Sequence, residues 1–299
     1  KPEQLTVNAA VMTGPTAIGM VKLMEDNRKG VSQNSYNFTV AGSADEITPK
    51  LVQGALDIAA VPVNLASVLY NKTNGGVKIL AVNTLGVLYI VTKGTDIAYV
   101  SDLKGKTIYA TGKGATPEYT LRHVLEKNGI DPDNDVTIEF KTEPKEIVAV
   151  MKNAENAVAM LPQPYVTVAG SAVEGLSVAL DLTAEWDTLG ENSRLITGAL
   201  VVRTAFADAH PEIVSAFLKE YEKSANYANE DVDGAAELLG SFGIFDAAVA
   251  KKAIPFCNVV CITGSEMKNA VSGYLEILHG MNPASVGKNL PADDFYYVK

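Results

Sequence analysis

The strongest constraint on the fold is a repeated alternation between short apolar segments and segments with helical periodicity. Residues 5–11 (LTVNAAV) are apolar and favour a strand, and Ile18, Val21, Leu23 and Met24 then recur at helical spacing. Short, wholly apolar strands of this kind are typical of parallel sheets. The order strand, helix, strand therefore predicts a parallel α/β sheet with helices on both faces. The same alternation continues through strands 37–42, 56–62 and 77–84 and helices 45–54, with Ile47, Leu51 and Val52 inward, and 64–72.

A second α/β unit follows, and the chain ends in helical segments. The apolar segments 87–93 and 195–206 lie at the two ends of this unit, so 87–93 and 198–204 are the expected crossings between units. This predicts a discontinuous first lobe, 1–90 plus 200–299, and a second lobe, 91–199. The second unit's expected elements are 101–130, 136–142, 143–156, 157–162, 164–172 and 176–183, and helices follow at 211–230, 233–243, 246–254 and 265–281.

Composition narrows the class of protein. The chain has 299 residues, 47% hydrophobic and 20% charged, with a formal net charge of −10. Nucleic-acid binding needs a basic surface, which this charge argues against. No run of 18 apolar residues predicts a membrane span. The start shows no signal peptide, which leaves two alternatives open: a cytoplasmic protein, or a mature protein whose export signal has been removed.

The two cysteines, Cys257 and Cys261, favour neither a disulfide nor a metal site. In an extended strand their Cα atoms would lie roughly 13 Å apart, too far for a disulfide. The three histidines are scattered, so a zinc site lacks ligands. Buried or partly buried thiols are expected, and a local disulfide stays open.

The glycine loop at 112–116 (GKGAT) resembles a phosphate-binding loop at first sight. Its spacing fits neither standard phosphate motif, because Lys113 lies between two glycines and Pro117 stands where a third glycine is needed. The glycines permit a tight turn with exposed amides. Thr116 is expected to cap the following helix and Pro117 to begin it. A helix N-terminus of this kind favours an anion or another polar group, and plain helix capping is the alternative.

Similar polar loops follow other expected strands. Because the carboxyl ends of parallel strands bind ligands in open α/β sheets, these loops together suggest a ligand cleft. They lie at 13–16 (TGPT), 43–46 (SADE), 62–64 (PVN) and 162–165 (PQPY).

Four stretches of the sequence resemble the substrate-binding proteins of ABC importers. They are 13–25 (TGPTAIGMVKLME), 45–72 (DEITPKLVQGALDIAAVPVNLASVLYNK), 102–130 (DLKGKTIYATGKGATPEYTLRHVLEKNGI) and 157–166 (AVAMLPQPYV). The similarity is to the nitrate, sulfonate, taurine and thiamine-pyrimidine-precursor group, over essentially the whole chain. It implies a type II periplasmic-binding-protein fold, in which two Rossmann-like lobes joined by a two-strand hinge close on a ligand.

The resemblance also implies the partners and the site. A monomer without cofactor or metal would capture a small polar or anionic molecule (sulfonate-, nitrate- or pyrimidine-like) and deliver it to membrane permease subunits. It would act outside the cytoplasm, lipid-anchored or periplasmic, as a binding protein and not an enzyme. The ligand-binding residues carried over by position are Thr13, Gly14, Pro15, Thr16, Ser43, Asp45, Pro62, Asn64, Asn83, Thr84, Thr111, Lys113, Gly114, Ala115, Thr116, Gln163 and Tyr165, with Trp186 added as a stacking candidate.

Several alternatives stay open at this point. Lys113 either contacts an anion or is a solvated lysine, and Trp186 either stacks on a planar ligand or packs within the protein. A cytoplasmic enzyme of the same fold, such as a menaquinone-pathway lyase or a pyrimidine synthase, is the alternative function. His123 is expected mid-helix, and no paired carboxylates or Ser-His-Asp set supports catalysis. No helix-turn-helix segment supports a transcription factor.

Overall fold

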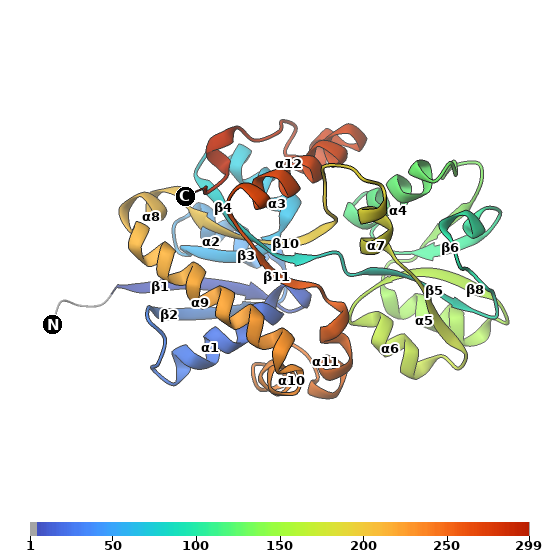
Figure 1. Cartoon of the computed structure of the whole chain (residues 1–299), viewed down its shortest axis with the longest axis horizontal. Coiled ribbons are helices and arrows are strands. Elements are labelled where there is room, and N and C mark those ends of the chain that lie inside the picture. The colour runs from blue at the N-terminus through green and yellow to red at the C-terminus, as the bar shows by residue number, and fades with distance from the viewer. Residues whose placement is uncertain (1–4, 299) are drawn as a thin grey trace. The chain divides into compact units, whose positions relative to one another are not determined.

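The computed structural model describes residues 5–298, which form two compact units (Figure 1). The first contains the described residues up to Leu85 and those from Ile196 onward, and the second runs from Gly86 to Leu195. The chain therefore crosses at Gly86 and at Leu195. The segments expected to cross follow these points instead, because β5 (Leu88–Lys93) lies in the second unit's sheet and β10 (Ile196–Arg203) in the first.

The first unit is built on a six-stranded sheet with the order β11-β4-β10-β3-β1-β2. Strands β1, β2 and β3 pair in parallel, as the alternation predicts, whereas β10 is antiparallel to both β3 and β4, and β11 to β4. The four strands of the predicted alternation therefore run in the same direction, and the antiparallel strands of this sheet are β10 and β11, which lie outside that alternation. Only strands joined by helical crossovers must be parallel, and β10 enters from the second unit. The other bounds are β1 (Thr6–Met12), β2 (Ser35–Ala41), β3 (Ile58–Pro62), β4 (Val77–Leu85) and β11 (Val259–Ile262).

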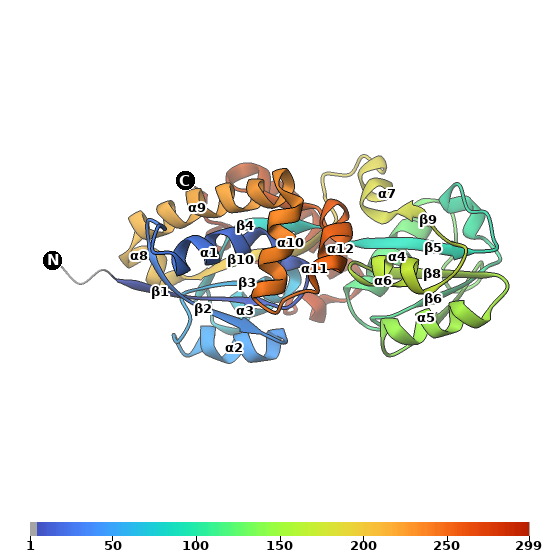
Figure 2. The same cartoon turned by 90° about the horizontal axis from the view of Figure 1, so that it is seen from below.

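Helices cover both faces of this sheet. In the strand order β2-β1-β3, the chain moves outward from β1 to β2 and then back past β1 to β3. Because both crossovers are right-handed, α1 lies on one face of the sheet and α2 on the other. Figure 2 shows α1 and α9 on one side of the sheet and α2 and α3 on the other. The bounds are η1 (Pro15–Met20), α1 (Val21–Arg28), α2 (Ala44–Val52), α3 (Val63–Lys72), α8 (Thr204–Ala209), α9 (Pro211–Glu230), α10 (Val232–Ser241), α11 (Ala247–Ala253), η3 (Ile254–Phe256), α12 (Gly264–Met281), η4 (Pro283–Val286) and η5 (Asp293–Phe295).

The second unit repeats the plan on a five-stranded sheet with the order β7-β6-β8-β5-β9. Strands β6, β7 and β8 are parallel, and β5 is antiparallel to β8 and β9. In each unit a strand that follows a crossing, β5 or β10, runs against its neighbours. The other bounds are η2 (Val100–Leu103), β6 (Thr107–Ala110), α4 (Thr116–Lys127), β7 (Thr137–Phe140), α5 (Pro144–Asn153), β8 (Ala157–Pro162), α6 (Tyr165–Ala172), β9 (Leu176–Asp181) and α7 (Leu182–Thr188).

Most of the expected core is confirmed, with some corrections. Ile18, Val21, Ile47 and Leu51 are buried, but Val52 is 46% exposed. Successive helical residues differ by about 100°, so Val52 leaves the face that the residues at 47 and 51 share. The expected strand at 195–206 ends at Arg203, where α8 begins, and the sequence reading missed both α7 and β11.

Both cysteines are free thiols. Cys257 is fully buried and its Sγ contacts the Ala253 carbonyl oxygen. Burial raises the pKa of each thiol to about 12, with a smaller contribution at Cys261 from the nearby Glu222 carboxylate. The expectation of thiols is thus confirmed over the disulfide. No helix within residues 5–298 is long and apolar enough to cross a membrane.

A buried carboxylate fastens β10 into the first sheet. The Asp57 side chain, which is 6% exposed, accepts a hydrogen bond from the backbone amide of Asn8 at 2.9 Å and pairs with Arg203 Nη2 at 2.7 Å. Arg203 Nε also donates to the Leu56 carbonyl oxygen, and its backbone amide donates to the Asp57 carbonyl oxygen. The Asp57 side chain, which lies just before β3, therefore links β1 to the end of β10.

Replacing this carboxylate should destabilise the first unit. Asp57→Ala leaves the Arg203 guanidinium and the Asn8 amide without their partner, which should lower the free energy of unfolding by about 2–3 kcal/mol. Urea denaturation followed by circular dichroism measures the change. Asp208→Ala, at an exposed position of α8, is the matched control and should change the stability little; an equally stable Asp57→Ala would contradict this role.

Candidate functional site

The carboxyl ends of β1, β2, β3 and β4 meet at one edge of the first sheet. Strand pairing aligns Met12 with Ala41 and Gly198 with both Pro62 and Thr84. The predicted residues at 13–16, 43–45, 62–64 and 83–84 therefore share this edge. They gather there because parallel strands end on the same side of a sheet, and their role as ligand contacts stays a prediction.

A buried polar cluster lies at this edge. Asn83 is 1% exposed, and its Nδ2 donates to the Thr16 carbonyl oxygen at 3.0 Å, while the Thr84 hydroxyl bonds Asn83 Oδ1 at 3.1 Å. Thr16 is 5% exposed, yet its Oγ1 has no hydrogen-bond partner among the described residues. A buried unpaired hydroxyl costs free energy, so a site where one persists invites a polar ligand group.

Gly198 makes room for this cluster and was missed by the sequence reading. A Cβ at this position would lie 2.5 Å from both Thr16 Cγ2 and Asn83 Oδ1. Tyr221 closes the cluster from α9, where it is fully buried and donates to the Val260 carbonyl oxygen at 3.2 Å. An isolated glycine inside a strand is a signal for such close approach, and the strand at 195–206 contained it.

The other predicted residues of this edge differ in their exposure and in whether their side chains already make hydrogen bonds. Ser43 and Asp45 are exposed at the start of α2, whose N-cap Ser43 makes no side-chain capping bond. Asn64 is half-buried and its Nδ2 donates to the Ser285 carbonyl oxygen at 3.0 Å. The Asn64 amide group thus holds the C-terminal segment. Thr13 is exposed, and Gly14 takes a φ of 132°, which favours glycine.

In the second unit the GKGAT loop differs from the prediction. Helix α4 begins at Thr116, its N-cap is Ala115, and no side chain caps it from that position. The Gly114 amide, expected to be free, donates to Glu118 Oε1 at 2.8 Å, and the Ala115 amide donates to the Gly112 carbonyl oxygen. The loop therefore satisfies these amides internally. Lys113 and Gly114 are both exposed.

Glu118 is held by two partners of positive or partly positive character. Its second oxygen, Oε2, accepts from Arg122 Nε at 2.9 Å, and Arg122 Nη2 pairs with Asp133 at 3.0 Å. Burial alone would raise the pKa of the Glu118 carboxyl, but the Gly114 amide and the Arg122 guanidinium outweigh it and lower that pKa. The carboxylate therefore stays ionised at neutral pH and places a negative charge beside the loop.

The loop after β8 is uncharged. Gln163 is 4% exposed. Its backbone amide donates to the Val87 carbonyl oxygen, and its side-chain Oε1 accepts from the Thr167 hydroxyl at 2.9 Å. Tyr165 begins α6 and is 40% exposed. Val87 follows the first crossing, so this loop is tied to the segment that enters the second unit.

Trp186 packs inside the second unit. It is 1% exposed, donates from Nε1 to the Ser193 hydroxyl at 2.9 Å and lies 4.4 Å from His123 between ring centroids. His123 is itself buried and its Nε2 lies 2.7 Å from Glu191 Oε1. The packing alternative therefore fits Trp186, and ligand stacking does not. Arg194 pairs with Asp187 at 3.1 Å.

Thr183 was not among the predicted site residues. Its Oγ1 is a second buried hydroxyl without a hydrogen-bond partner among the described residues. It lies near the start of α7, where its amide donates to Asp181 Oδ1 at 2.9 Å. A Cβ on Gly86 would lie 2.2 Å from Thr183 Oγ1 and 2.7 Å from Leu195 Cδ2. Thr183 therefore packs beside both crossing points of the chain.

Two kinds of loop follow the parallel strands. After β2, β6 and β7 a glutamate of the next helix accepts the hydrogen bond of a loop amide, from Gly42 to Glu46, Gly114 to Glu118 and Thr142 to Glu146. After β1, β3 and β8 the next helix has no acidic residue in its first turn, and a proline lies at its start. The uncharged loops carry Thr16, Asn64 and Gln163.

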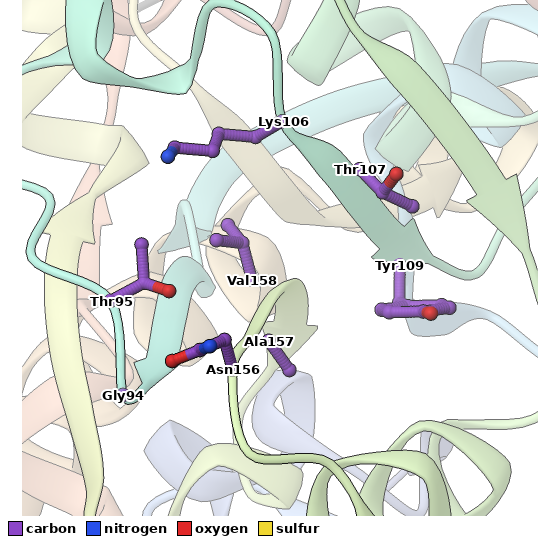
Figure 3. A pocket seen from close by; sticks show the side chains of 8 residues that line it. All are labelled: Gly94, Thr95, Lys106, Thr107, Tyr109, Asn156, Ala157 and Val158. Atoms are coloured by element: carbon purple, nitrogen blue, oxygen red, sulfur yellow. The ribbon is translucent and has the colours of Figure 1, made fainter.

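The opposite edge of the second sheet holds a hollow of about 580 Å³ (Figure 3). It lies where β6 and β8 begin and β5 ends, and Lys106 is its one basic side chain. None of the predicted ligand residues lines it. Across residues 5–298, no group of three His, Cys, Asp or Glu side chains is placed to hold a metal ion.

The Gly198 contact leads to a test of the buried cluster. Gly198→Ala should displace Thr16 or Asn83 and lower the free energy of unfolding by about 1–3 kcal/mol, because the site has no room for a methyl group. Gly280→Ala, on α12 where an added Cβ would meet no heavy atom within 4 Å, should instead stabilise by about 0.5 kcal/mol. Urea denaturation of both variants checks the contrast, which fails if both change stability in the same direction.

Comparison with known proteins supports a transport-related family. A protein of Bacillus subtilis (strain 168), named for binding aliphatic sulfonates, is 28% identical over 166 residues. The match covers 55% of this chain and 46% of that protein, so the chain matches less than half of this relative's length.

Solved structures share the fold over nearly the whole chain. An ABC transporter structure from Parabacteroides distasonis has a TM-score of 0.82 at 24% identity, covering 98% of this chain and 99% of that one. The periplasmic aliphatic sulphonate binding protein SsuA from Escherichia coli has a TM-score of 0.73 at 15% identity, covering 98% and 93%. These structures confirm the predicted periplasmic-binding-protein fold. Both SsuA and the Bacillus relative are named as binding proteins and not as enzymes.

The family itself is shown by a sequence model. The NMT1-like family model matches residues 26–240, more than half of the chain. This match covers the loops after β2, β3, β6 and β8 and both crossings. The resemblance to substrate-binding proteins of the sulfonate and nitrate group is confirmed by these findings together. The chain therefore belongs to the NMT1-like family.

Proposed function

We propose that this protein is an extracytoplasmic solute-binding protein that captures a small polar molecule and delivers it to an ABC importer. The observation that carries the proposal is the buried cluster at the carboxyl edge of the first sheet. There Thr16 Oγ1 is buried without a partner among the described residues, beside Asn83 and Thr84. The fold shared with SsuA supports the same role.

We name the proposed contacts in each unit by itself. In the first unit they are the loop 13–16 and the Asn83–Thr84 pair, and in the second the loops at 111–116 and 163–165. We place Thr16 and Gln163 among the main contacts because both lie in uncharged loops at carboxyl strand ends. Asn64 and Trp186 are left out, since the Asn64 side chain holds the C-terminal segment at Ser285 and the Trp186 ring packs beside His123 inside the second unit.

Native mass spectrometry of the purified protein tests this function directly. We expect a small molecule to remain bound under gentle ionisation and to be lost on unfolding. Small-angle scattering with and without that molecule then tests the predicted hinge closure, which should reduce the radius of gyration. Failure of the protein to bind any solute, in this experiment and in a thermal-shift screen of sulfonates, pyrimidines and small carboxylates, would contradict the proposal.

Thr16→Val separates binding from stability. Valine keeps the shape of threonine and removes a hydroxyl that has no partner in the described structure, so the variant should unfold at the same or a higher temperature. Its affinity for the co-purified molecule should fall about fivefold or more, the loss of one hydrogen bond. Calorimetric titration and thermal unfolding measure the two effects. Unchanged affinity would remove Thr16 from the site.

A further inference from the structure

The GKGAT loop carries its own anion. A helix N-terminus attracts negative charge because its amides are unpaired and its dipole end is positive. At α4 the carboxylate of Glu118 already takes this place, since Glu118 Oε1 accepts from the Gly114 amide at 2.8 Å. Arg122 on the same helix is bound to both Glu118 and Asp133, and the exposed Lys113 of the loop places a second positive charge near the Glu118 carboxylate.

In the first unit, taken by itself, the candidate residues carry no positive charge. The candidate residues at 13–16, 43–45, 62–64 and 83–84, the last pair within β4, include neither lysine nor arginine. Apart from the exposed Asp45 carboxylate, the polar side chains named here are neutral: the buried Thr16 hydroxyl, without a partner among residues 5–298, and the Asn83–Thr84 pair. An unpartnered hydroxyl suits a ligand group that donates or accepts a hydrogen bond without carrying a charge.

We propose that Glu118 is a specificity determinant that keeps strong anions off the GKGAT loop, so that the ligand group which meets this loop is uncharged. The inference rests on the proposed function and narrows its ligand class. A sulfonate at this loop would find the Gly114 amide already bound to the Glu118 carboxylate, which the Arg122 and Lys113 charges favour in its ionised form. The solute is therefore an electrically neutral, hydrogen-bonding molecule at this end, in contrast to the sulfonates named for two of the similar proteins.

Titration with methanesulfonate and with sulfate, at constant ionic strength, tests the role of Glu118. Glu118→Ala frees the Gly114 amide and removes the charge, so it should bind methanesulfonate about tenfold more tightly than the unmodified protein. Glu118→Gln removes the charge, but its amide oxygen can still accept from Gly114, so it should fall between the two. This order of affinities is expected only if Glu118 excludes the anion both by its negative charge and by occupying the Gly114 backbone amide.

Glu126→Ala is the matched control. It removes the same charge from the exposed, C-terminal part of α4 and should leave the affinity for methanesulfonate unchanged. Circular dichroism verifies that each variant is folded, and Glu118→Gln, which conserves size, keeps the test valid if the alanine variant unfolds.

Two results would overturn the inference. One is methanesulfonate binding to the unmodified protein as tightly as to either Glu118 variant. The other is a gain in Glu126→Ala equal to that in Glu118→Gln, which would reduce the effect to net charge. A protein that binds no solute in native mass spectrometry would refute the proposed function separately, because the titration measures only anion exclusion at this loop.

Discussion

The insertion of β10 between β3 and β4 is the constraint on which the first unit depends. The strand returns from the second unit and pairs with both neighbours, so residues far apart in sequence complete one sheet. The Asp57–Arg203 pair fixes one end of β10, and Gly198 lies near the other. Without a side chain at 198, Thr16 and Asn83 can approach the strand backbone. The same strand thus closes the core and shapes the candidate site.

Charge is distributed unevenly among the loops of both units. The glutamates at positions 46, 118 and 146 each fold back onto a loop amide. This is an internal capping device: it satisfies a backbone donor and complements the helix dipole within a few residues of sequence. The helices that follow β1, β3 and β8 have no acidic residue in the first turn and lack it. The loops thus fall into two groups. In one group a glutamate binds a loop amide, and in the other the loop carries neutral polar side chains and no such glutamate.

The second unit shows how a buried aromatic cluster fixes a helix near the candidate loop. His123 on α4 packs against Trp186 on α7 with the two rings tilted, and Glu191 binds the imidazole. Lys127 adds a longer contact to Glu191, at 3.5 Å. These contacts hold α4, which begins at the GKGAT loop, against the segment that leads to the second crossing. Trp186 therefore supports the position of the loop, and its ring is not offered to a ligand.

The sequence by itself determined the alternating architecture, most helix and strand positions and the edges where the loops gather, because hydrophobic periodicity and turn residues are local signals. It also indicated Thr16, Asn83 and Gln163. Only the tertiary structure decided the direction of β5 and β10, the exposure of Val52 and the burial of Trp186, since these depend on contacts between distant segments. The GKGAT loop shows the difference most clearly. Its glycines predicted open amides, but whether Glu118 turns back onto Gly114 or outward to solvent depends on Arg122 and Asp133, which the loop's own residues do not specify.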